Sequence, residues 1–179
     1  MGITPLFKQE DVLKQLNLGK EMIEDQILRV LKFVGEEFAK NARARVTETI
    51  YERTVYDKHG NARERQPWEL TGNLRSSIGY FVLKNGEVID QKFQDNPAGK
   101  EAAEKLLNKI PNKDGLQLIG VAGMDYASYV ESRGFDVITT SGDIAIVSLK
   151  RKIKQFQDML NRRGAQVNFN LSNAVGTII

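Results

Sequence analysis

The stretch GVAGMDYASYVESRGFDV, residues 120–137, is expected to change conformation twice over a short length. Apolar residues lead into Gly123-Met124-Asp125, and residues 126–131 then favour a compact helical turn. Gly134 is expected to end that turn, because glycine readily terminates a helix, and an extended segment follows over 135–138. So many local changes indicate either an active site or a corner of the fold.

The composition fits one globular domain. The chain has 179 residues, of which 41% are hydrophobic and 27% are charged, enough for a core and a solvated surface. The 26 basic residues exceed the 23 acidic ones by only three, so the charge balance does not demand a nucleic-acid partner. Cysteine is absent, which excludes disulfides, thiol catalysis and zinc sites built on cysteine.

The N-terminus lacks the features of a secretory signal, and we expect a soluble protein made in the cytoplasm. The segment MGITPLFKQEDVL turns polar and acidic early. No apolar run approaches the ~20 residues that a membrane span needs.

The strongest predicted helix runs from about Lys20 to about Thr47. Gly35 lies inside this pattern and indicates a close packing contact. Residues 1–19 are expected to form a lead-in arm, in which a weak helix ends at Asn17-Leu18-Gly19. The apolar residues of the strong helix recur at steps of three and four, namely Ile23, Ile27, Leu31, Val34, Phe38, Ala42 and Val46.

The middle of the chain predicts a small, mostly antiparallel sheet. Asn85-Gly86 is a strong signal for a two-residue hairpin turn between strands at 79–83 and 87–93. Residues 116–122 are expected as a third strand. Upstream, the polar segment 54–67 predicts a flexible loop or a loose hairpin.

Three further helices are predicted around these strands. Thr71 is a good N-cap for one short turn before Ile78. A helix over 100–110 is expected after a loop at 95–99. The apolar spacing over 143–162 favours a helix, which we prefer to a strand at 144–148 because the periodicity continues.

The last residues carry an alternating pattern. Val167, Phe169 and Leu171 alternate with polar residues, so 165–179 is expected as an arm or edge strand that can clasp a neighbour. Taken together, these patterns predict a single α+β domain over residues 1–179. A long N-terminal helix and a C-terminal helix pack its small sheet.

Few residues in the sequence suggest catalysis. His59 is the only histidine, which excludes a catalytic triad and a multi-histidine metal site. No phosphate-binding glycine motif is present. Asp125 and Glu131 could share a divalent ion in a metal-dependent hydrolase, although capping and surface roles are favoured for both. We predict no catalytic residue, metal ligand or cofactor.

A cluster of basic residues lies on the predicted C-terminal helix, formed by Lys150, Arg151, Lys152 and Lys154. Such a basic face could contact phosphates, and a nucleic-acid-binding module is therefore the alternative function. The favoured interpretation is the solvated side of an amphipathic helix, because no exposed aromatic groove accompanies these residues.

Two short blocks carry a family resemblance. The first contains Thr71, Gly72, Leu74, Arg75, Ser77 and Ile78, and the second contains Tyr126, Ala127, Val130, Glu131 and Gly134. With a long helix before them and a hairpin between them, they resemble the minor tail or tail-completion proteins of long-tailed bacteriophages, which join head and tail.

The chain departs from the family pattern in two places. Residues 138–141 read Ile-Thr-Thr-Ser where the family often has a Pro-Phe-Leu-type segment, and the 95–115 insertion is longer than expected. The subtype therefore stays open between tail terminator, head-closure and adaptor protein.

The resemblance implies a structural virion component at the head–tail junction of a phage or prophage. It implies a ring-like homo-oligomer with other neck or tail proteins as partners and no enzymatic activity. DNA would lie close without specific binding, and no membrane or small-molecule substrate is expected. In this setting Thr71, Leu74 and Ile78 are expected to form a fold corner with Tyr126, Tyr129 and Val130. Arg75 and Glu131 are candidates for an ion pair between the blocks.

Overall fold

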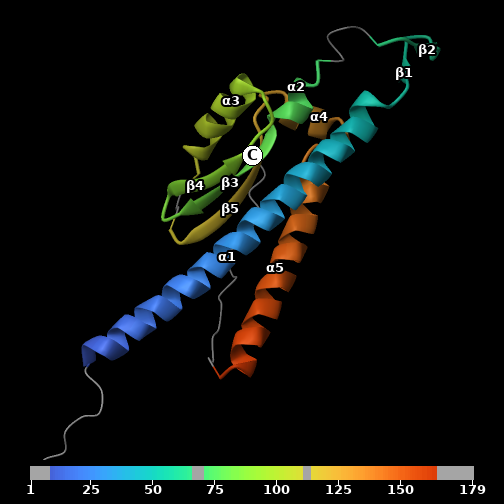
Figure 1. Ribbon diagram of the computed structural model, residues 1–179. Helices are drawn as coiled ribbons and strands as arrows, with labels where there is room; N and C mark the ends of the chain where they lie inside the picture. Colours follow the sequence, from blue (N-terminus) through green and yellow to red (C-terminus); the bar gives the residue numbers. More distant parts are fainter. Residues whose placement is uncertain (1–8, 66–70, 111–113, 165–179) are drawn as a thin grey trace, which may run out of the picture.

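The chain folds as an α+β structure in which two long helices and a short one enclose a three-stranded sheet (Figure 1). The computed structural model describes residues 9–65, 71–110 and 114–164. Residues 1–8 of the expected lead-in arm and the expected C-terminal arm 165–179 lie outside the described residues. The α+β class and the predicted pair of packing helices are confirmed. The helices are α1 Gln9–Val46, α2 Asn73–Ser77, α3 Pro97–Leu107, α4 Ala127–Ser132 and α5 Thr139–Arg162.

Helix α1 is longer than the sequence indicated. It begins at Gln9 and includes Asn17-Leu18-Gly19, so the predicted break there is wrong. A glycine costs a helix interior only about 1 kcal/mol, and favourable residues on both sides carry the helix through it. At its other end α1 runs into a single π-turn, η1 Thr47–Tyr51.

The sheet has the order β4-β3-β5 and is antiparallel throughout. Strand β3 (Ile78–Lys84) lies in the centre, between β4 (Glu87–Lys92) and β5 (Leu116–Ala122). The predicted Asn85-Gly86 turn is confirmed, with φ values of 51° and 85°. Positive φ at both positions defines the turn type whose twist matches a hairpin.

Both faces of the sheet are covered, and side chains of β3 alternate between two cores (Figure 1). Ile78, Tyr80 and Val82 point to the core shared with α1 and α5. Phe81 and Leu83 point to the core shared with α3. Because alternate residues of a strand face opposite sides and both sides are covered, residues 78–83 are all buried and show no polar alternation.

Gly35 provides the close approach that its place in α1 predicted. A Cβ atom at this position would lie 2.6 Å from Cδ2 of Tyr80 and 2.9 Å from its Cε2. The Tyr80 ring is buried, and its hydroxyl donates to Asp90 Oδ2 at 3.2 Å. Burial first, and then the nearby Asp90 carboxylate, raise the pKa of this phenol far above its usual range.

We predict that Gly35→Ala destabilises the protein by about 1 kcal/mol. The alanine gains about 1 kcal/mol of helix propensity, but overpacking against a buried ring costs about 1–3 kcal/mol. Urea unfolding followed by circular dichroism measures the net effect. A gain in stability of the size usual for an exposed helical glycine would contradict the contact with Tyr80.

Residues 54–65 form the loose hairpin that was one of the two predictions for this segment. Strand β1 (Val55–Tyr56) pairs with β2 (Ala62–Arg63) in an antiparallel ribbon. Asp57 Oδ1 holds its turn by accepting from the backbone N–H groups of His59 and Asn61. Figure 1 shows this hairpin projecting from the body beyond the end of α1. We call it the hairpin arm.

Three helix starts differ from the prediction. Gly72, with φ 68°, precedes α2 and no side chain caps it, so Thr71 is not its N-cap. Helix α3 starts at Pro97 because Asn96 caps it, accepting from Gly99 N at 2.9 Å. Helix α5 starts at Thr139 rather than 143, and no strand forms over the predicted extended segment 135–138. The choice of helix over strand at 144–148 is confirmed.

Candidate functional site

The fold brings the two blocks of the sequence side by side. The first block enters β3 through α2, and the second leaves β5 through α4. Ile78 pairs with Ala122 in the sheet, and Gly123 N donates to Ser77 O at 3.2 Å. Leu74 and Ile78 are buried together with Ala127, and Val130 packs against the same core. We call this junction the corner.

Helix α1 is fixed to the corner through Arg43. Its Nε and Nη2 atoms both donate to Ile78 O, at 3.2 and 2.6 Å. Desolvation lowers the pKa of this guanidinium from its ordinary value. The Arg43 guanidinium therefore donates both hydrogen bonds to the carbonyl of Ile78, at the point where α2 ends and β3 begins.

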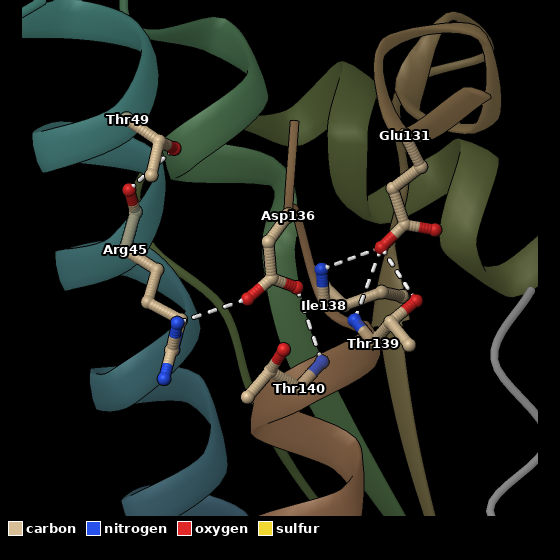
Figure 2. A network of polar contacts seen from close by, with 7 residues as sticks. All are labelled: Arg45, Thr49, Glu131, Asp136, Ile138, Thr139 and Thr140. Carbon is tan, nitrogen blue, oxygen red and sulfur yellow. Dashed lines mark hydrogen bonds and ion pairs between the residues drawn. The ribbon is translucent and has the colours of Figure 1, made fainter. Parts of the chain in front are cut away.

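Glu131 of the second block caps the start of α5 (Figure 2). Its Oε1 accepts from Ile138 N and Thr139 N, both at 3.0 Å, and from Thr139 Oγ1 at 2.8 Å. The first N–H groups of a helix have no partner within the helix and carry partial positive charge. A carboxylate from α4 therefore supplies the cap that Ile138, at the N-cap position, cannot provide.

Asp136 adds a second carboxylate at the same helix end (Figure 2). Its Oδ1 accepts from Thr140 N at 3.1 Å. Its Oδ2 is buried without a hydrogen bond among the described residues, and Arg45 Nη1 lies 3.2 Å away as an ion pair. Figure 2 shows Arg45 on α1 pointing toward Asp136, so the pair ties α1 to the start of α5. Neither Arg45 nor Asp136 was predicted as a site residue from the sequence.

The predicted ion pair between Arg75 and Glu131 does not occur among the described residues. Arg75 lies over the ring of Tyr51 in η1, 5.9 Å from its centroid. Glu131 is turned toward α5 instead. The interpretation of Glu131 as the partner of an arginine is therefore wrong, and its partners are backbone and hydroxyl donors.

The tyrosines of the second block lie at the surface rather than in the core. Tyr126 is 44% exposed and Tyr129 is 57% exposed. The Tyr129 hydroxyl accepts from Arg133 Nη2 at 2.6 Å, and the guanidinium lies 5.0 Å from the ring centroid. The two residues are four positions apart and pair on one helix face. Gly134, with φ 85°, ends this helix as predicted.

A groove of about 490 Å³ lies beside the corner, beneath the base of the hairpin arm. Its walls come from η1, the arm, α2 and α4, and no carboxylate is among its described lining residues. The Arg53 guanidinium lies 5.4 Å from the Phe135 ring centroid, and Arg65 Nη2 donates to the carbonyls of Ile50 and Arg53. The lining residues are Thr49, Ile50, Tyr51, Arg53, Thr54, Val55, Tyr56, Arg65, Thr71, Leu74, Tyr126, Val130 and Phe135.

This groove has an apolar, aromatic character with fixed polar groups at its edge. Burial is the largest influence on the Tyr126 phenol and raises its pKa. The two lining arginines contact the Phe135 ring and the carbonyls of Ile50 and Arg53 and stay cationic, so the groove presents rings, methyl groups and hydroxyls beside two positive charges. Such a surface is suited to binding an uncharged peptide segment rather than to transferring protons or binding a metal ion.

The basic face of α5 is mostly exposed. Lys150, Arg151 and Lys154 are exposed, and within residues 9–65, 71–110 and 114–164 none of them makes an ion pair or hydrogen bond. Lys152 differs, because its Nζ lies 4.2 Å from the Phe33 ring centroid on α1. Three of the four predicted contact residues are thus available to a partner, while the fourth shields an aromatic ring.

The carboxylates considered for a metal do not converge. Asp125 is exposed, and Glu131 is occupied by three donors. The described part of the chain has no group of three or more His, Cys, Asp or Glu side chains that could hold a metal ion. His59 is exposed in the turn of the hairpin arm. None of the described helices combines the length and apolar character that crossing a membrane requires.

Comparisons with known proteins give no match for this chain, whether with family models, curated proteins or solved structures.

Proposed function

We propose that this protein is a structural component of a bacteriophage virion at the head–tail junction, acting by ring-like assembly without catalysis. The observation that carries the proposal is the pairing of the two blocks. The Thr71–Ile78 and Tyr126–Gly134 segments resemble those of tail-completion proteins, and they meet at one corner of a rigid fold. The order of helix, block, hairpin and block matches the resemblance along most of the chain.

The shape of the molecule supports a role in assembly. A closed ring needs two different complementary surfaces on each copy, because its contacts run head to tail. The hairpin arm and the N-terminal end of α1 both extend away from the sheet (Figure 1). The groove at the corner is a concave surface lined by aromatic rings. Projecting and receiving elements are thus present in one subunit.

The partners follow from this role. They are further copies of the chain and other neck or tail proteins, and the chain would be made in the bacterial cytoplasm and retained in the virion. Neither a cofactor nor a small-molecule substrate is part of the proposal. DNA passing the junction would lie near without sequence-specific contacts.

The test is assembly with phage proteins. We expect the purified chain, alone or mixed with tail-tube protein, to form rings or particle-bound subunits in electron microscopy and light scattering. Antibody labelling is expected to place it at the neck of intact virions. A chain that remains monomeric under these conditions and is absent from virions would overturn the proposal.

A nucleic-acid-binding module is the second candidate, because Lys150, Arg151 and Lys154 are exposed and unpaired in the described part of the chain. Neutralising phosphates releases counterions, so such binding would weaken steeply as salt increases. Tight, salt-dependent binding of duplex DNA by the isolated protein, lost when the three residues are changed to serine, would favour this function over the structural one.

A further inference from the structure

The groove at the corner is a concave surface that could receive a partner, and its chemistry restricts what it can bind. Rings of Tyr51, Tyr126 and Phe135 line it, together with threonine hydroxyls and the methyl groups of Leu74 and Val130. Its volume of about 490 Å³ suits a few apolar side chains rather than a folded element. An occupant with apolar side chains alternating with small polar ones, and with no charge to desolvate, would match it.

The chain itself contains such a segment. Residues 165–179 read AQVNFNLSNAVGTII and include no charged side chain. Val167, Phe169 and Leu171 alternate with Asn168, Asn170 and Ser172. In an extended conformation the three apolar residues share one face, spaced about 6.6 Å apart, and the asparagines face the other side.

These three residues cannot reach the groove of their own chain. Helix α5 has 24 residues, so its two ends lie about 36 Å apart. The groove residues Val130 and Phe135 precede the start of α5, while the alternating segment follows its end. Leu171 lies seven residues beyond Gly164 and can extend at most about 25 Å from it. Contact with the groove therefore requires a second copy.

We propose that Val167, Phe169 and Leu171 of one copy bind in the corner groove of a second copy. This contact rests on the proposed function, and it is the contact through which the assembly would grow from one copy to the next. Tail and groove are different surfaces at opposite ends of α5, so the contact is head to tail and continues from copy to copy until a ring closes. The aromatic side chain of Phe169 would contribute most of the buried area.

Disulfide trapping tests the contact directly, because the 179 residues of the chain include no cysteine. One protein sample carries Tyr56→Cys at the groove and a small added tag, and a second, untagged sample carries Val167→Cys and keeps Phe169. After mixing and mild oxidation, we expect the mixed disulfide dimer to exceed that of a control pair at least tenfold. The control replaces the groove variant by Val88→Cys, which is also exposed but lies on β4 and does not line the groove.

A second measurement uses the assembled state. We expect Phe169→Ser to lower the assembled fraction at least tenfold in light scattering, while Val88→Ser leaves it unchanged. Equal trapping in the two mixtures would overturn the inference. It would also be overturned if a chain carrying both Tyr56→Cys and Val167→Cys closed on itself, or if adding Phe169→Ser to the Val167→Cys sample left the trapping unchanged. Rings that form without the trapped dimer would leave the proposed function standing and exclude only this contact.

Discussion

Replacing Gly123 by alanine is expected to destabilise the fold by about 3 kcal/mol, the largest effect of any single methyl group in the described structure. Gly123 directly follows β5, where the chain passes the first turn of α3. A Cβ atom there would lie 1.9 Å from Gly99 O and 2.8 Å from Gly99 C. These are backbone atoms and cannot rotate away as a side chain can. Overpacking of this kind costs about 1–3 kcal/mol, and rigid backbone places it at the upper end.

Chemical denaturation gives the measurement, with Gly19→Ala as the matched control. Gly19 lies within α1 and has no atom within 4 Å of the position of an added Cβ. We expect this variant to gain about 0.5–1 kcal/mol from helix propensity alone. The urea midpoint should therefore move in opposite directions in the two variants. If Gly123→Ala unfolds at the same urea concentration as the parent, α3 does not approach the end of β5 as described.

The parts of the fold that were predicted correctly depend on short-range signals. Asn85-Gly86 fixes its turn because both positions need positive φ, which these residues tolerate. The apolar spacing of α1 and α5 is equally local, since each pattern needs only the residues of one helix. Gly19 shows the limit of such signals. A glycine can end one helix and be tolerated inside another. Whether the helix continues depends on the residues on both sides of the glycine.

The meeting of the two blocks at the corner was predictable from the sequence, but the partners of Glu131 and Arg75 were not. Arg75 and Glu131 were expected to pair because they carry opposite charges and lie in the two different blocks. The error followed from placing the start of α5 at 143. With the start at Thr139, the unpaired N–H groups of Ile138 and Thr139 become the obvious donors for a carboxylate. Asp136 could have been recognised in the same way, as an acidic residue just before a helix.

The groove could not have been predicted from sequence. Three of its walls, η1, the hairpin arm and α2, follow one another in the chain, but the fourth comes from α4, which follows the sheet and α3 in the sequence. Arg53 and Phe135 illustrate the difficulty. Each is unremarkable in its own segment, and their stacking depends on how the arm leaves the body. Surfaces assembled from several elements leave no periodic trace in a sequence.

Glu131→Ala is expected to cost about 2 kcal/mol, because one carboxylate oxygen satisfies three donors at the start of α5. Hydrogen bonds to a charged group contribute about 1.5–3 kcal/mol, and an uncapped helix start typically loses about 1 kcal/mol. Glu131→Gln keeps an acceptor oxygen and loses only the charge, so about 0.5–1 kcal/mol is expected. Urea unfolding of the three proteins should therefore rank Ala below Gln and Gln below the parent.

A double-mutant cycle with Arg75 separates the capping role from the rejected ion pair. Arg75 contacts the Tyr51 ring, and Glu131 contacts the start of α5, so the two side chains share no partner. Mutations without shared partners add within about 0.3–0.5 kcal/mol. We expect Arg75→Ala and Glu131→Ala to combine additively within that range. A coupling energy above about 1 kcal/mol would indicate a direct interaction and contradict the place of Arg75 over the Tyr51 ring, away from Glu131.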